Sequence, residues 1–170
     1  NQTDEAVETA PFAVVVGAER SDTVRGGSGE SRLRFRLPPW AVHATIDVQM
    51  PREQWPAFTD FGVTMLDGTG RILDKSPMNY AFGRLHVDLT GMDRAASPEA
   101  EVRLLPGFAD PAGGSWTATV SIRLYADSAS VRPLPGGPLT VPARQGATQV
   151  LPFSGPGLPA GPGFVPLAIV

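Results

Sequence analysis

Several residue types and patterns are missing from this sequence of 170 residues. It has no cysteine, which excludes disulfide bonds, thiolate zinc sites and cysteine nucleophiles. It has no apolar run of 18 residues, so no transmembrane helix is predicted. Only 18% of its residues are charged and the net charge is −3, which predicts no basic surface for nucleic acid. It has only 2 histidines, without a repeated ligand spacing, and we expect neither a metal site nor a cofactor.

Glycine and proline are abundant instead. The chain has 19 glycines and 18 prolines, while hydrophobic residues make up 42%. This mixture is typical of short strands joined by turns, and it disfavours a helical protein. The length suits one domain with a proper hydrophobic core.

Apolar and polar residues alternate strictly in several stretches, as they do in strands with one buried face. The clearest stretches are residues 115–126, 31–37, 43–50 and 84–89, and weaker ones are 12–17 and 100–105. Turn signals such as "RGGSGES", "LPPW" and "PGFADPAGG" separate them. We therefore expect an all-β fold, an antiparallel β-sandwich of about eight or more strands and jelly-roll-like, with an extended Gly/Pro-rich C-terminal arm.

The stretch "FTDFGVTMLDGTGRILDKSP", residues 58–77, has three evenly spaced aspartates around a glycine-rich centre. A calcium loop that starts at Asp67 would need an oxygen ligand where Arg71 stands, which argues against such a site. A hairpin with Asp67 at its turn explains the stretch better. If Leu66 pairs with Arg71, Val63 faces Asp74.

No group of residues forms a convincing catalytic set. His43 and His86 fall on predicted solvent faces of strands, and a site with Asp88 or Asp47 would need neighbours that the sequence does not identify. The serines of "GGSGES" lack the strand-to-helix turn of a nucleophile elbow. We expect no catalytic residues and no enzyme activity.

Three aromatic residues, Trp40, Trp55 and Tyr80, lie in or beside predicted loops. Exposed aromatic rings on a β-sandwich would stack on sugar rings. The prolines next to Trp40 and Trp55 favour the other interpretation, in which the rings cover the ends of the sandwich.

The composition divides the chain into three parts: an acidic N-terminal segment (1–10), a β-sandwich domain (11–130) and a Gly/Pro-rich arm (131–170). Proline and glycine disfavour central strands, so the arm is predicted to be extended. Its end is apolar, and such an end packs on its own sheet edge or on a partner. The predicted partner-binding residues are Phe164, Val165, Leu167, Ile169 and Val170.

The order of features in "LRFRLPPWAVHATIDVQM", residues 58–77, "RLHVDL" and "GGSWTATVSIRLYA" resembles the bacterial pre-peptidase C-terminal domain. The resemblance covers about residues 12–126. It implies a small secreted β-sandwich that is a non-catalytic accessory module of an exported protein, in some cases binding calcium or polysaccharide. The long Gly/Pro arm departs from that pattern.

These observations predict a periplasmic or secreted protein that acts as a structural or accessory subunit. We expect it to dock onto a larger protein assembly through its terminal arm. The alternative is a carbohydrate-binding module that uses the loop aromatics, and an enzyme site on the sandwich is a third candidate.

Overall fold

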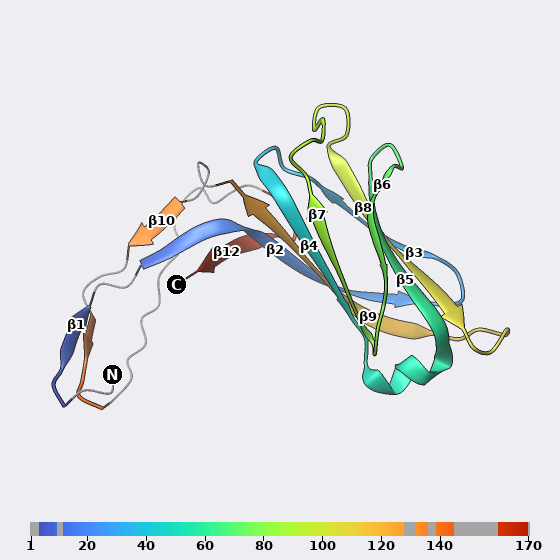
Figure 1. Cartoon of the computed structure of the whole chain (residues 1–170), viewed down its shortest axis with the longest axis horizontal. Coiled ribbons are helices and arrows are strands. Elements are labelled where there is room, and N and C mark those ends of the chain that lie inside the picture. The colour runs from blue at the N-terminus through green and yellow to red at the C-terminus, as the bar shows by residue number, and fades with distance from the viewer. Residues whose placement is uncertain (1–3, 10–11, 128–131, 136–138, 145–159, 170) are drawn as a thin grey trace.

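The computed structural model describes residues 4–9, 12–127, 132–135, 139–144 and 160–169. Two antiparallel sheets pack face to face as a β-sandwich (Figure 1), which confirms the predicted fold class. The one helical element is a single 3-10 helix, η1 (Arg52–Ala57), among these residues, and no helix in them is long and apolar enough to cross a membrane.

The first sheet has the strand order β10-β2-β9-β4-β7, and β12 also pairs with β2. The second sheet has the order β3-β8-β5-β6. The strands of the first sheet are β2 (Phe12–Gly26), β4 (Ala41–Gln49), β7 (Phe82–Asp88), β9 (Trp116–Ala126), β10 (Arg132–Pro135) and β12 (Val165–Ile169). Those of the second are β3 (Ser31–Arg36), β5 (Phe58–Asp67), β6 (Ile72–Pro77) and β8 (Glu99–Phe108).

Eight of these strands form four nested antiparallel pairs. β5 pairs with β6, and around this hairpin β4 pairs with β7, β3 with β8 and β2 with β9. One long hairpin has thus been rolled up, and the further pairs β4–β9 and β5–β8 join it into two sheets. This nesting is the jelly-roll arrangement of a double-sheet sandwich.

The core lies between the sheets and follows the predicted alternation. Along β9, the side chains of Trp116, Ala118, Val120, Ile122 and Leu124 are all buried, while the residues between them are partly or fully exposed. The same period-2 pattern buries one face of β4 and of β7. Burying such side chains is the main term that stabilises the sandwich.

The stretch 58–77 forms the predicted hairpin, but the predicted register is wrong. Leu66 faces Ile72 rather than Arg71, and Met65 rather than Val63 faces Asp74. The register shifts at a β-bulge between Met65 and Leu66. The loop from Asp67 to Arg71 shifts the register by one residue, and the bulge, which skips Leu73, shifts it by one more. Counting back from the turn reveals neither shift.

β2 is much longer than the predicted strand at residues 12–17. Its second half carries Arg20 and Asp22 on the same face as the buried Ala18, and these two side chains form an ion pair with each other. Charged residues on the inner face hide the apolar period that marks a strand.

The terminal segments lie partly on the sandwich and partly away from it. β12 pairs with β2 from Glu19 to Val14, so the apolar end of the chain lies along its own sheet. β1 (Val7–Thr9) and β11 (Leu139–Val141) pair with each other and form what we call the terminal ribbon. Figure 1 shows the terminal ribbon at a distance from the sandwich, at the far end of β2.

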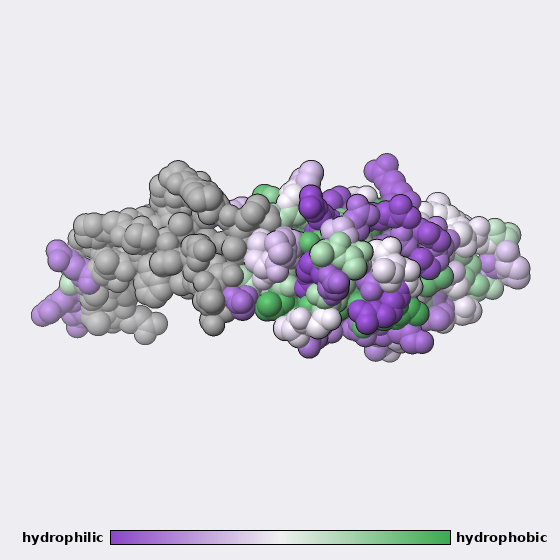
Figure 2. Space-filling view, turned by 90° about the horizontal axis from the view of Figure 1, so that it is seen from above, coloured by the Kyte–Doolittle hydropathy of each residue, from purple (hydrophilic) through white to green (hydrophobic). Residues whose placement is uncertain are grey.

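Figure 2 views the molecule from above and shows one end of the sandwich. Hydrophilic residues cover most of the described part of this face, and the hydrophobic areas between them are small. Scattered apolar residues of this kind are normal for a protein surface.

Candidate functional site

A cavity of about 420 Å³ lies beside the turn between β6 and β7 and is lined by Arg52, Trp55 and Tyr80. We call it the Tyr80 cavity. Tyr80 is 80% exposed, Arg52 is exposed and Trp55 is half-buried. A volume of about 300–1,000 Å³ is usual for small-molecule sites, and aromatic side chains commonly line them.

Tyr80 belongs to a tight two-residue turn. The backbone N–H of Phe82 donates to the carbonyl of Asn79 at 3.0 Å, and the N–H of Asn79 donates back to the carbonyl of Phe82 at 2.7 Å. Tyr80 and Ala81 between them have positive φ angles of 47° and 68°. This is the pattern of a type I′ turn, whose usual residues are asparagine and glycine, so tyrosine and alanine hold the turn at a conformational cost.

Both walls of the Tyr80 cavity are fixed to the sandwich. The N–H of Met50 donates to the carbonyl of Ala81 at 2.9 Å, and the Ala81 side chain is buried. On the opposite wall, Gln54 of η1 accepts a hydrogen bond from the N–H of Thr117 at 3.0 Å. The two segments that line the cavity are therefore each attached to the sandwich by a hydrogen bond.

Trp55 connects the cavity to an aromatic cluster in the core. Its ring lies 6.3 Å from the ring of Phe58, which contacts Phe61 and Phe108 at 5.3 and 4.7 Å. Phe61 in turn meets Trp116 edge to face at 5.0 Å. Trp55 thus both packs on the core and lines the cavity. Its position therefore fits both predictions from the sequence, a ring that covers the end of the sandwich and a ring that is open to a ligand.

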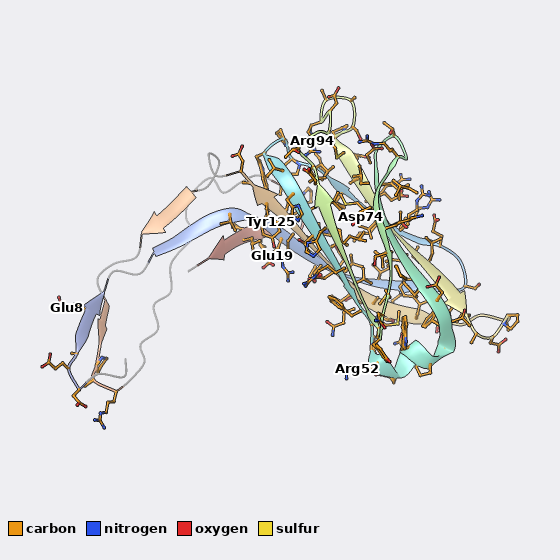
Figure 3. The ribbon with its side chains drawn as sticks, viewed as in Figure 1. Glu8, Glu19, Arg52, Asp74, Arg94 and Tyr125 are labelled. Carbon is orange, nitrogen blue, oxygen red and sulfur yellow. The ribbon has the colours of Figure 1, made fainter. Side chains whose placement is uncertain are left out.

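Trp40, the third predicted stacking residue, does not join the other two. It precedes Ala41, whose carbonyl accepts a hydrogen bond from Arg94 at 2.7 Å. Figure 3 shows Arg94 and Arg52 at opposite ends of the sandwich. Trp40 packs against the core, as its neighbouring prolines indicate, so the structure brings together Trp55 and Tyr80 only.

The tip of the β5–β6 hairpin is occupied by its own hydrogen bonds. The Asp67 carboxylate accepts hydrogen bonds from the N–H groups of Thr69 and Arg71, the Thr69 hydroxyl and the Arg71 guanidinium, at 2.6–3.1 Å. Burial alone would raise the pKa of Asp67, but these hydrogen bonds outweigh it and hold the pKa below its usual range. Asp67 is a turn former.

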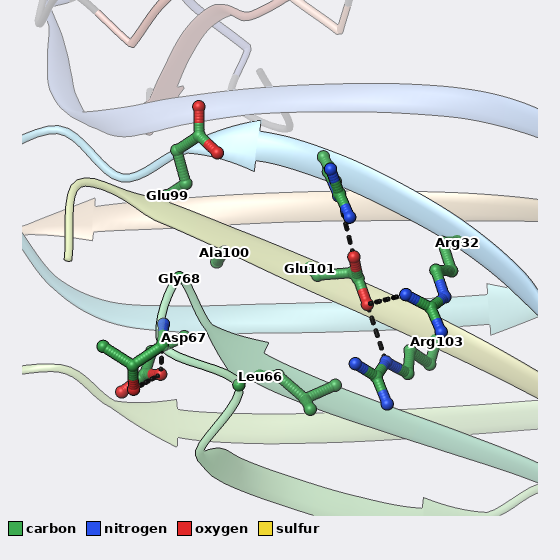
Figure 4. Close-up of a pocket in the computed structure, with 11 residues that line it drawn as sticks. Arg32, Leu66, Asp67, Gly68, Glu99, Ala100, Glu101 and Arg103 are labelled. Carbon is green, nitrogen blue, oxygen red and sulfur yellow. Dashed lines mark hydrogen bonds and ion pairs between the residues drawn. The ribbon is translucent and has the colours of Figure 1, made fainter.

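A polar cavity of about 290 Å³ lies next to this tip (Figure 4). Its wall carries the buried Glu101, which accepts hydrogen bonds from Arg34 at 2.8 Å and from Arg103 at 2.6 Å and lies 3.8 Å from Arg32. Hydrogen bonds from Arg103 and Arg34 lower the pKa of Glu101. These arginines already share an internal carboxylate, so this cluster has a structural explanation.

The histidines meet on the outer face of the first sheet. The ring of His43 lies 6.0 Å from both His86 and Tyr125, and His43 faces Asp88 in the register of β4 and β7. Asp47 instead binds Arg84 and Arg123 through hydrogen bonds. Within the described ranges, no three histidine or carboxylate side chains are placed to hold a metal ion.

The predicted partner-binding residues fall in and beside β12. Phe164 is half-buried, with its ring 6.2 Å from Phe35, whereas Val165 is 55% exposed. Leu167 and Ile169 face Gly17 and Val14 of β2 in the register. Val170 lies outside the described residues.

Comparisons with known proteins give only weak structural matches. No protein-family model matches the chain, and no curated protein matches it in sequence. The CspB protease of Clostridium perfringens matches with a TM-score of 0.28 and 14% identity over 63% of this chain and 25% of the protease chain. The coat protein of tobacco streak virus matches with a TM-score of 0.26 and 12% identity over 75% of this chain and 91% of the coat protein.

A structure of the Gx strain of infectious bursal disease virus also matches, with a TM-score of 0.26 and 9% identity over 77% of this chain and 35% of the viral chain. Likenesses this weak do not bear on function. The resemblance to pre-peptidase C-terminal domains therefore stays a prediction. The chain spans about a quarter of the length of the CspB protease chain that it matches.

Sequence reasoning did not find the Tyr80 cavity as a unit. Arg52 and Trp55 come from η1, and Tyr80 comes from a turn about 25 residues later that carries no glycine signal. The pairing of β4 with β7, which brings the two segments to the same end of the sandwich, depends on the rolled topology.

Proposed function

We propose that this protein is a non-catalytic accessory or structural subunit, periplasmic or secreted, that docks onto a larger protein assembly through its terminal arm. The observation that carries the proposal is the terminal ribbon, which combines the N-terminal segment with the arm and extends away from the sandwich (Figure 1). The fold itself supplies a rigid body behind it.

The terminal ribbon is too small to be stable alone. It has three residue pairs, from Val7–Val141 to Thr9–Leu139. The adjoining ion pair between Asp4 and Arg144 has both side chains more than 70% exposed, so it adds little stability. An isolated two-stranded ribbon is at best marginally stable in water. A partner surface that covers the terminal ribbon would supply the missing burial.

The apolar end of the arm has a divided role in this proposal. Pairing with β2 and the contact of Phe164 with Phe35 attach it to its own sheet. Val165, the first residue of β12, has an exposed side chain that a partner protein would contact. A strand of the partner would add to the sheet beside β12. Removing residues 152–170 should leave the eight nested strands, β2 to β9, folded and should weaken docking.

A photo-crosslinking amino acid placed in the terminal ribbon tests the proposal. Glu8 is exposed, and its replacement should give a covalent adduct with a partner protein in cells that make the chain. The matched control is Lys75, which is exposed on β6 of the sandwich (Figure 1 shows β6 far from β1) and should give no adduct. Adducts from position 75 and not from position 8 would contradict docking through the arm.

Deleting residues 1–9 provides an independent measurement. It removes β1, which pairs only with β11 among the described strands, so the unfolding midpoint of the sandwich should not change. Binding to the partner identified by the crosslink should be lost in size-exclusion chromatography. A truncated protein that still binds this partner would show that the terminal ribbon is not the docking site.

A second candidate function, binding of carbohydrate, is favoured by one specific observation. Trp55 and Tyr80 line the same cavity, with Tyr80 exposed enough to stack on a sugar ring. The two functions are compatible, because the Tyr80 cavity lies on the sandwich and the terminal ribbon lies away from it (Figure 3). A glycan array with the whole chain and with Tyr80→Asn tests this function, which fails if the unaltered chain binds no glycan.

A further inference from the structure

We propose that the Tyr80 cavity binds a sugar ring that carries a carboxylate, such as a uronic acid unit of an acidic polysaccharide. The inference rests on the second candidate function and deepens it by naming the ligand class. Three features support it: the strained position of Tyr80, the attachment of both lining segments to the sandwich, and the charge of Arg52, which forms no ion pair within the described residues.

The strain at Tyr80 points to a role outside folding. A non-glycine residue with positive φ is uncommon, and each one raises the energy of the folded chain. Tyr80 has φ 47° and is 80% exposed, so its ring gains little from packing in exchange. Asparagine or glycine would form the same turn with less strain. A ring retained in such a place is suited to contact a ligand.

The cavity is also suited to flat apolar faces. Trp55 is held against Phe58, and the Tyr80 turn is held through the carbonyl of Ala81, so two aromatic residues border one space without further ordering. Aromatic faces stack on the C–H faces of sugar rings, and a preformed site loses little conformational entropy on binding.

Arg52 supplies the charge that selects the ligand. It lines the cavity, and no carboxylate in the described part of the chain forms an ion pair with it, unlike Arg32, Arg34, Arg84, Arg103 and Arg123. Its neighbour Glu53 does not line the cavity. A guanidinium donates paired hydrogen bonds to a carboxylate, and hydrogen bonds of this charged kind are the strong ones. The ligand should therefore be anionic as well as ring-shaped.

Isothermal titration of the whole chain with two matched sugars tests the inference. Methyl glucuronide should bind about 10-fold or more tightly than methyl glucoside, because only the glucuronide carboxylate accepts a charge-assisted hydrogen bond from Arg52. Arg52→Gln should remove this preference and leave the affinity for the glucoside unchanged. Arg36→Gln removes the same charge from an exposed position on β3 and should change neither affinity.

Tyr80 variants complete the experiment without a risk to folding. Tyr80→Asn should weaken the binding of both sugars by about 10-fold or more through the loss of stacking, whereas Tyr80→Phe should keep it. Equal binding of both sugars, or a preference that survives Arg52→Gln, would overturn the acidic-sugar inference while leaving sugar binding in place. Binding of neither sugar by the unaltered chain would overturn the inference and count against the carbohydrate function itself.

Discussion

The two turns that flank β6 differ in how well their residues suit them. At the β5–β6 turn, Asp67 accepts hydrogen bonds from the turn itself, and Gly70 takes the positive φ of 88°. At the β6–β7 turn, Tyr80 and Ala81 take positive φ values without a glycine. The residues of the first turn favour its backbone geometry. The residues of the second turn, tyrosine and alanine, disfavour the positive φ angles that they adopt.

This difference shows where sequence motifs mislead. The first turn looked like a site because of its aspartates and glycines, and those residues serve the hairpin. The second turn had no motif, yet it carries the strained and exposed ring of the Tyr80 cavity. Strain that folding does not need is the observation that makes Tyr80 a candidate for ligand contact.

The largest expected effect on the free energy of unfolding comes from removing the Asp67 carboxylate. Asp67→Ala should lower the free energy of unfolding by about 2–3 kcal/mol, because several charge-assisted hydrogen bonds disappear from a buried position. Urea unfolding measures this effect. Asp74→Ala in the same hairpin is the control, since among the described residues Asp74 accepts a hydrogen bond only from the N–H of Lys75. Its effect should be about 0.5 kcal/mol or less. Equal effects would remove the distinction between the two aspartates.

The second effect, of intermediate size, is the pH dependence of the stability that the Asp67 carboxylate contributes. The pKa of Asp67 is lowered in the folded protein, so its contribution is fully present above the ordinary carboxyl value of about 4 and is lost as the pH falls through the lowered pKa. The difference in unfolding free energy between the unaltered chain and Asp67→Asn should therefore be constant near pH 7 and shrink below about pH 4. The lowered pKa values of Asp47 and Glu101 act in both proteins and cancel. A difference that grows in acid would contradict the assignment.

The smallest expected effect has the opposite sign at the other turn. Tyr80→Asn should raise the free energy of unfolding by about 0.5–1 kcal/mol, because asparagine tolerates positive φ and little packing is lost. Gly70→Ala is the opposite test at the first turn, since it places a side chain at a positive φ. No atom outside the neighbouring residues lies within 4 Å of the added methyl, so backbone strain alone should lower the free energy of unfolding by about 1–2 kcal/mol. Thermal unfolding of both variants checks the signs, and destabilisation by Tyr80→Asn would show that the tyrosine ring stabilises the turn.

Much of the sandwich could be predicted from alternation. In β9 the residues from Trp116 to Leu124 alternate because one face of the strand is buried and the other is wet. The prediction fails where the inner face carries charged residues. Arg20 and Asp22 form an ion pair on the inner face of β2, so alternation did not predict the second half of that strand. The loop after Leu66 and the bulge between Met65 and Leu66 each shifted the hairpin register by one residue, and no local pattern records either shift.

The candidate site could be predicted only in pieces. Trp55 and Tyr80 were identified as aromatic residues near loops, but so was Trp40, which lies at the other end of the sandwich. Which of them meet depends on strand order and on long-range pairing, and a single sequence specifies these weakly. Arg52 had no distinguishing feature until the cavity showed which residues surround it.

The nested pairing of β2–β9 also determines when the terminal ribbon can form. Both ends of the chain leave the roll from its outermost pair, since β1 precedes β2 and β10 to β12 follow β9. These two strands are the most distant partners in the roll, and contacts of high sequence separation are slow to form. Pairing of β2 with β9 brings together the two ends that make the terminal ribbon. We therefore expect a partner that binds the terminal ribbon to select chains in which this outermost pair has formed.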